Sequence, residues 1–336
     1  MSVLEYGDAP DPRLGVPGGT WALDVPDRVP AVWGHGNEVA WSRLEPALIV
    51  GADGTGKTVV AFNIAVRLAG LVTEPLLGLP VLPRKRVLYL AQDRPRQAQR
   101  ALRRMLGTMD RDPLNDALTV IDWPIDTVER NPEVLVELAT ANDADTVIVD
   151  SLKDITEELS SEATGASLKR AFALCVTESV DVLGLHHDRK AQDSKRRLLK
   201  LSDVYGSRLI TAGCGSVLAL NGVSGDPVIE LRHLKQVVEE VGPMSISFNF
   251  DTGEVSAVEG TDLLAIVNAA RGGITANDAA RLLYQTDKPT RAEKERARRK
   301  LDSLLKRQLV VALKGSERNE PDRFCGVVTA PKGGAR

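Results

Sequence analysis

A phosphate-binding motif of eight residues constrains this chain more than any other feature of its sequence. Residues 51–58 read Gly-Ala-Asp-Gly-Thr-Gly-Lys-Thr, which fits the pattern G-x-x-x-x-G-K-[ST]. The apolar run Ala47–Val50 before the motif predicts a buried strand, and residues 59–65 after it predict the start of a helix. A strand, a glycine-rich loop and a helix in this order are the context in which such a motif binds phosphate. The alternative is a glycine-rich turn that matches by accident.

Each position of the motif has an expected role. The glycines let backbone N–H groups surround the β-phosphate, and the helix N-terminus adds partial positive charge. Lys57 is expected to reach the β- and γ-phosphates, and the Thr58 hydroxyl to bind Mg²⁺. The sequence therefore predicts ATP and Mg²⁺ as cofactors. The predicted phosphate-binding residues are Gly51, Ala52, Asp53, Gly54, Thr55, Gly56, Lys57 and Thr58.

Composition is that of an ordinary globular protein. Of the 336 residues, 43% are hydrophobic and 26% are charged, which gives enough apolar material for a substantial core. No apolar run approaches the ~20 residues that cross a bilayer, and the first residues do not resemble a secretory signal. We therefore expect a cytoplasmic protein without a membrane partner. The three cysteines, Cys175, Cys214 and Cys325, have no metal-site or disulfide spacing and are expected to be buried.

Alternating apolar runs and helical periodicity predict an α/β fold with a mostly parallel sheet. Residues 1–40, rich in Pro and Gly, are expected to form an extended arm or an irregular covering layer; residues 41–259 are expected to form the nucleotide-binding domain. The predicted strands are Ala47–Val50, Val87–Ala91, Leu118–Ile121, Thr146–Val149, Val182–Leu185, Val217–Leu220 and Val228–Leu231, followed by a hairpin over 245–258. The predicted helices are Thr58–Leu71, Arg96–Met109, Pro132–Ala141 and Ala166–Ser179.

A second unit is predicted over residues 260–330. Its expected helices are Thr261–Ala270, Thr275–Tyr284 and Arg291–Arg307, and a hairpin follows over 309–328. Three helices followed by a hairpin is the order of a winged-helix domain. Residues 287–307 hold nine cations and four anions, and the third helix of a winged helix is the one that enters a DNA groove. Arg298 and Arg299 are therefore candidate DNA contacts, although mixed charge also occurs on helices simply for solubility.

Several further motifs occur in a fixed order along the first domain. They are Val87–Asp93, Thr146–Ser151, Leu183–Lys190, Gly206-Ser207 and Leu231–Lys235. In this order they resemble the RecA-like ATPases of the replicative helicase type, close to the RepA and DnaB group and to helicase-like ATPases of actinobacterial phages. The resemblance runs from about residue 30 to residue 258, and the C-terminal tail lies outside it.

The resemblance assigns roles to the ends of two strands. Asp150, at the end of a buried strand, is expected to hold Mg²⁺ or its water, since a hard cation prefers carboxylate oxygen; the alternative is a helix cap. The family places a glutamate where this chain has Gln92. Asp93 is therefore the candidate base, because an amide cannot accept a proton from water. Its alternative is to cap the helix that begins near Pro95.

Two more residues follow from the family pattern. His187 is expected to sense the γ-phosphate, since members similar to RepA share the His186-His187 pair; adjacent strand residues face opposite sides, which argues against a shared metal. Lys235 matches the lysine of a Lys-x-Arg pair that reaches the nucleotide of the next subunit. The arginine position is occupied by Val237.

The segment 188–200 is strongly basic. It carries six cations and two aspartates, and helicases of this type place such a loop in the central channel of a ring, against the single-strand backbone. A solvated surface loop is the alternative. The candidate single-strand contacts are Arg189, Lys190, Lys195, Arg196 and Arg197.

Together these features predict an ATP-dependent helicase or translocase acting in DNA replication. The resemblance implies a ring homo-oligomer, a hexamer in this family, with single-stranded DNA as ligand; recruitment of a primase or other replication protein stays open. The alternative is an ATP-switched DNA-binding regulator or helicase loader with little unwinding activity.

Overall fold

The computed structural model describes residues 15–107, 109–188, 200–222, 224–225, 228–258, 263–270, 272–284, 286–306, 308–314 and 321–327. The chain forms two compact units, and the division falls between Ala257 and Val258. Each unit is described by itself.

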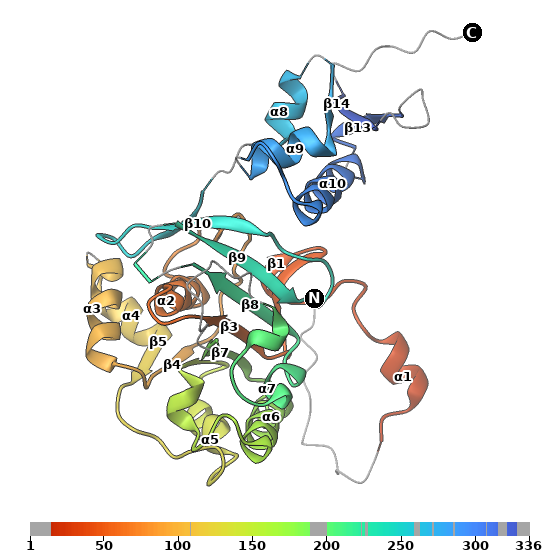
Figure 1. The fold of residues 1–336 in the computed structure, drawn as a ribbon. Helices are drawn as coiled ribbons and strands as arrows, with labels where there is room; N and C mark the ends of the chain where they lie inside the picture. Colours follow the sequence, from red (N-terminus) through yellow and green to blue (C-terminus); the bar gives the residue numbers. More distant parts are fainter. Residues whose placement is uncertain are drawn as a thin grey trace. The chain divides into compact units, whose positions relative to one another are not determined.

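A nine-stranded sheet in the order β11-β10-β9-β8-β3-β7-β6-β4-β5 organises the first unit (Figure 1). Neighbouring strands from β8 to β5 run parallel, whereas β8, β9, β10 and β11 pair antiparallel in sequence. The predicted α/β class and the predicted strand positions are confirmed. The strands are β3 (Ala47–Gly51), β4 (Val87–Ala91), β5 (Leu118–Ile121), β6 (Thr146–Asp150), β7 (Asp181–His187), β8 (Ser216–Asn221), β9 (Val228–Lys235), β10 (Met244–Phe248) and β11 (Val255–Ala257).

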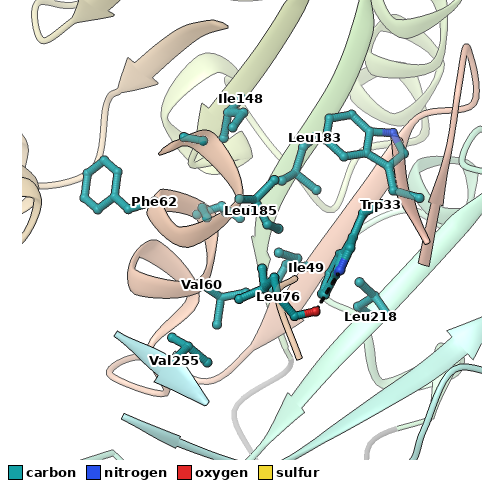
Figure 2. Close-up of a cluster of buried hydrophobic side chains, with 14 of the residues drawn as sticks. Trp33, Ile49, Val60, Phe62, Leu76, Ile148, Leu183, Leu185, Leu218 and Val255 are labelled. Carbon is teal, nitrogen blue, oxygen red and sulfur yellow. Dashed lines mark hydrogen bonds between the residues drawn. The ribbon is translucent and has the colours of Figure 1, made fainter. Parts of the chain in front are cut away.

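Helices cover both faces of this sheet. The helices are α1 (Gly18–Leu23), α2 (Lys57–Leu68), α3 (Pro95–Leu106), α4 (Arg111–Ala117), α5 (Val134–Ala141), α6 (Glu162–Thr177) and α7 (Arg208–Ala212), with short 3₁₀ turns η1 (Leu152–Ile155) and η2 (Leu201–Asp203). Because side chains alternate along a strand, Ile49 of β3 faces one core with α2 and α3, and Leu48 faces the other with α5 and α6. Figure 2 shows part of the first core.

The N-terminal part of the first unit differs from the expected irregular arm. Within the predicted arm, β1 (Ala31–His35) pairs with β2 (Glu38–Ser42) as an antiparallel hairpin. Trp33 and Trp41 are fully buried, and the Trp33 indole N–H donates to the Leu76 carbonyl at 3.2 Å, a bond drawn in Figure 2. The prediction is wrong for residues 31–40, because two tryptophans are used to cover one face of the sheet.

A charge cluster closes the amino-terminal edge of the parallel strands. Asp181, the first residue of β7, is buried and accepts the Leu44 N–H at 2.7 Å. Arg84 Nη2 lies 2.6 Å and Arg43 Nε 3.4 Å from Asp181 Oδ2. Burial raises the pKa of Asp181 against the opposing effect of Arg84. The arrangement ties the segments before β3 and β4 to the start of β7.

The second unit combines three helices with a small sheet. In chain order its elements are α8 (Leu263–Ala269), β12 (Ile274–Thr275), α9 (Ala276–Leu283), α10 (Arg291–Lys306), β13 (Val310–Leu313) and β14 (Arg323–Gly326). The sheet order is β12-β14-β13, so the predicted hairpin gains a short strand that the sequence did not indicate. Val267, Ala280, Leu301 and Phe324 contribute to its separate core.

Two expectations about special residues can also be checked. The three cysteines are free and buried, as predicted. In the part of the chain that the structure describes, no helix has the length and apolar character needed to span a membrane.

Candidate nucleotide site

The phosphate loop lies between β3 and α2, at the carboxyl end of the parallel strands. Gly54 and Gly56 have φ angles of +75° and +88°, which a residue with a side chain rarely adopts. A Cβ on Gly56 would lie 2.5 Å from the ring of Phe248 in β10, and one on Gly54 would collide with the Ser224 hydroxyl. The loop can therefore present its backbone N–H groups only because both positions are glycine.

Lys57 is held inside the loop that it serves. Its side chain is buried, and Nζ donates to the carbonyls of Gly51 at 2.8 Å and Ala52 at 2.9 Å. Burial lowers the pKa of Lys57, and the nearby Asp53 and Asp150 oppose that shift. An ammonium partnered by two neutral carbonyls can exchange them for phosphate oxygens at little cost, because the phosphate returns charge compensation.

Asp150 and Thr58 meet beside the loop. The Thr58 hydroxyl donates to Asp150 Oδ2 at 2.8 Å, and the Tyr89 hydroxyl donates to the same oxygen at 2.8 Å. Tyr89 is fixed by stacking on Phe62 of α2, with ring centroids 4.6 Å apart. Burial raises the pKa of Asp150 to about 6, although both hydroxyls act to lower it.

This pair fits a divalent cation. Among the described residues, two neutral hydroxyls hold the buried carboxylate and no cationic side chain lies within bonding distance of it; a hydroxyl plus a carboxylate is the donor set that Mg²⁺ uses beside phosphates. Ser151, and not Asp150, stands at the N-cap of η1, which removes the helix-cap alternative for Asp150. Within the described ranges no group of three or more His, Cys, Asp and Glu could hold a metal by protein ligands alone. A cation here would need the nucleotide as a further ligand.

Gln92 and Asp93 point in different directions. The Gln92 amide donates to the carbonyls of Ile121 at 3.3 Å and Trp123 at 3.0 Å, at the end of β5. Asp93 instead forms an ion pair with Lys153 Nζ at 3.3 Å. The N-cap of α3 is Arg94 and receives no side-chain bond, so the alternative of Asp93 as that cap does not apply.

The two adjacent histidines have separate environments, as their positions on a strand predict. His186 is buried, and its Nε2 lies 2.7 Å from the Tyr205 carbonyl. His187 Nδ1 lies 2.8 Å from Asp53 Oδ1 in the phosphate loop. Burial, together with Lys57 and Lys153, lowers the pKa of His187, so the ring is neutral near pH 7. With its N–H on Nδ1 toward Asp53, the neutral ring has no second N–H for a phosphate.

Lys235 lies at the other edge of the sheet. It pairs in register with Val217 at the start of β8, whereas the loop follows the end of β3. Its ammonium donates to the carbonyls of Thr211 at 3.1 Å and Cys214, at the C-terminal end of α7. Within its own chain Lys235 is therefore directed away from the phosphate loop.

The DNA-contact residues fall in two regions. Arg298 and Arg299 are exposed on α10 of the second unit. The predicted single-strand contacts Arg189, Lys190, Lys195, Arg196 and Arg197 lie outside the described residues.

Four residues of this region were not singled out from the sequence: Tyr89, Arg94, Lys153 and Phe248. Lys153 follows the Asp150 motif by three residues, and a single turn after a strand end would have brought it to the same edge of the sheet. Tyr89 occupies an apolar strand pattern and carried no separate signal. Phe248 comes from the antiparallel hairpin, and its contact with the loop depends on tertiary structure alone.

Comparisons with known proteins agree with this geometry. Residues 36–193 match the family described as AAA domain. A solved structure of a phage-type replicative protein's counterpart, described as an ATPase domain, superposes with a TM-score of 0.50 at 13% sequence identity, and the match covers 70% of this chain and 94% of that chain. No curated protein matches by sequence. Residues 36–193 of the chain are therefore an AAA domain, and they lie within a P-loop unit that has the RecA-like ATPase fold.

Proposed function

We propose that the chain is a Mg²⁺-dependent ATPase that moves on single-stranded DNA as a RecA-like helicase or translocase in DNA replication. One observation carries this proposal. Lys57, the Thr58–Asp150 pair and Asp93 gather at the carboxyl edge of one parallel sheet, beside a loop whose glycines leave the backbone open to phosphate.

The chemistry follows from these side chains. The loop and Lys57 bind and orient the β- and γ-phosphates, and Thr58 with Asp150 would hold Mg²⁺, which neutralises phosphate charge when bound. Asp93 is the carboxylate placed to accept a proton from the attacking water, since Gln92 is turned toward β5. His187, in contact with Asp53 of the loop, is placed to respond to the terminal phosphate.

Coupling to DNA is proposed through the basic segment after β7. Both flanks of that segment are anchored near the site: Asp188 bridges to Val204, and His186 contacts the Tyr205 carbonyl. A change at His187 is thus only one residue from the segment that carries the candidate single-strand contacts. We propose a ring of identical subunits, a hexamer by resemblance, in which Lys235 would have to exchange its α7 carbonyls for the nucleotide of a neighbour.

Unwinding of a forked duplex tests the proposal directly. Wild type, Lys57→Ala and the exposed-residue control Lys85→Ala would be compared with ATP and Mg²⁺. We expect unwinding by wild type and Lys85→Ala and none by Lys57→Ala. Equal unwinding by all three, or none by a wild type that hydrolyses ATP, would reject a helicase.

A second candidate is an ATP-switched DNA-binding regulator or loader. Two observations favour it: Gln92 stands where the family has a glutamate and faces away, and Lys235 is engaged within its own subunit. The second unit has a helix and strand order consistent with a winged helix, and the exposed face of α10 carries Lys294, Arg298 and Arg299. In this case α10 would be the main DNA reader.

Steady-state hydrolysis with and without single-stranded DNA separates the two candidates. A motor is stimulated strongly by the strand on which it moves. A switch binds ATP tightly, turns over negligibly and gains little from single-stranded DNA.

A further inference from the structure

Lys153 is a cation at the front of the site that neither the motif nor the family pattern assigns. It belongs to η1, the single turn that follows β6, and its Nζ lies 3.3 Å from Asp93 Oδ2. Lys153 is about one-third exposed and Asp93 somewhat less. The candidate base is therefore held in an ion pair when no nucleotide is bound.

The same ammonium acts on the phosphate loop. Burial works to raise the pKa of Asp53, but His187, Lys57, Lys153 and Arg94 together lower it. Lys153 also contributes to lowering the pKa of His187, after burial and Lys57. Since such effects fall off with distance, Lys153 lies between Asp93 on one side and the loop on the other.

The site also has a shortage of charge where a triphosphate would end. The family's arginine position holds Val237, and Lys235 is bound to carbonyls at the opposite edge of the sheet. Lys57 is seated deep in the loop. A terminal phosphate carries charge that one lysine and one divalent cation do not fully balance, and further cations at that position lower the barrier to its transfer.

We propose that Lys153 is a second phosphate-binding cation, which leaves Asp93 for the terminal phosphate when ATP binds. The inference rests on the proposed ATPase function and deepens it. With Lys153 on the phosphate, the Asp93 carboxylate is free to take a proton as the water oxygen bonds to the γ-phosphorus and the bond to the β-γ bridging oxygen breaks. The base is thus released only by a nucleotide that has a terminal phosphate.

The discriminating measurement is the affinity for ADP set against that for a nonhydrolysable ATP analogue, both with Mg²⁺. For Lys153→Gln we expect the preference for the analogue over ADP to fall about tenfold, because only the analogue has the phosphate that Lys153 contacts. Lys153→Arg is expected to keep the preference. Asp93→Asn, which removes the competing partner, is expected to raise analogue affinity about threefold while abolishing hydrolysis.

Arg94→Gln is the matched control for charge. Arg94 Nε lies 4.0 Å from Asp93 Oδ1, but its side chain is 71% exposed. We expect less than a twofold change in the preference. An equal effect of Arg94→Gln and Lys153→Gln would overturn the proposal in favour of a general field. So would parallel losses of ADP and analogue binding in Lys153→Gln, or no loss of either.

The outcome is separable from that of the proposed function. Tryptophan fluorescence checks folding of each variant, because all four tryptophans lie in the first unit. A wild type that binds neither nucleotide would reject the ATPase itself. A wild type that binds both but does not unwind DNA would reject the helicase and leave the Lys153 test intact.

Discussion

Asp150 and Asp181 are buried aspartates on adjacent strands, and they lie at opposite edges of one sheet. Asp181 opens β7 opposite Thr146, the first residue of β6, and Asp150 is the last residue of β6. Asp181 faces Arg84 and Arg43 at 2.6 and 3.4 Å. Asp150 faces two hydroxyls and, among the residues that the structure describes, no cation at bonding distance.

The difference in partners separates a structural carboxylate from a binding one. Removing a carboxylate from water costs several kcal/mol, and at Asp181 permanent guanidinium charges offset much of that cost. At Asp150 hydroxyl donors offset only part of it, so burial raises the pKa to about 6. A site that must accept a cation has to remain incompletely paired without it. The amino edge of the sheet thus contributes stability, and the carboxyl edge gives up stability for binding.

The largest expected effect is on hydrolysis at the carboxyl edge. In Asp150→Asn the amide oxygen can still accept from Thr58 and Tyr89, but the charge that holds Mg²⁺ is lost. We expect ATP hydrolysis to fall on the order of a thousandfold, about 4 kcal/mol of barrier, with the fold retained. Steady-state phosphate release measures the rate, with the exposed Asp143→Asn as control. Retained hydrolysis would show that Asp150 is not the cation ligand.

At the amino edge the expected effect is on stability. Asp181→Ala leaves Arg84 buried without its carboxylate, and we expect the free energy of unfolding to fall by about 3 to 5 kcal/mol. Urea unfolding followed by tryptophan fluorescence measures it. Asp143→Ala, which breaks the exposed Lys85–Asp143 pair, should change stability by less than about 1 kcal/mol. Equal effects of the two variants would mean that Asp181 behaves as a surface charge.

The pH dependence sharpens the comparison further. Asp150 keeps its proton in the folded chain up to pH about 6, well above the ordinary value of 3.8, so its contribution is full below 3.8 and is lost as pH rises through about 6. Asp150→Asn has no such loss. With a chelator present, we expect its stability advantage over wild type to grow by about 1 to 2 kcal/mol from pH 5 to pH 8. A constant or shrinking difference would contradict the incomplete pairing of Asp150.

Sequence reasoning succeeded where the signal was local. The apolar runs of the parallel strands and the motif after β3 depend on neighbours in the chain, so both were predicted at nearly the correct bounds. The β1–β2 hairpin was missed because its tryptophans lie among Gly and Pro residues that indicated a loop. The partners of Gln92 and Lys235 were beyond prediction, since their bonds go to backbone carbonyls of Trp123 and Thr211, far away in sequence.

Gln92 gives the smallest expected effect and tests whether the carboxyl edge was interpreted correctly. The family pattern suggests that Gln92→Glu would restore a base and raise hydrolysis. The structure argues otherwise, because the Gln92 amide donates to two carbonyls at the end of β5 and a carboxylate there would oppose them. We expect Gln92→Glu to lower the free energy of unfolding by about 1 kcal/mol and to leave the hydrolysis rate within about twofold of wild type. Asp93→Asn, measured beside it for phosphate release, should abolish hydrolysis with little effect on unfolding. A clear rate increase in Gln92→Glu, with activity retained in Asp93→Asn, would move the base back to position 92 and make Asp93 only the partner of Lys153.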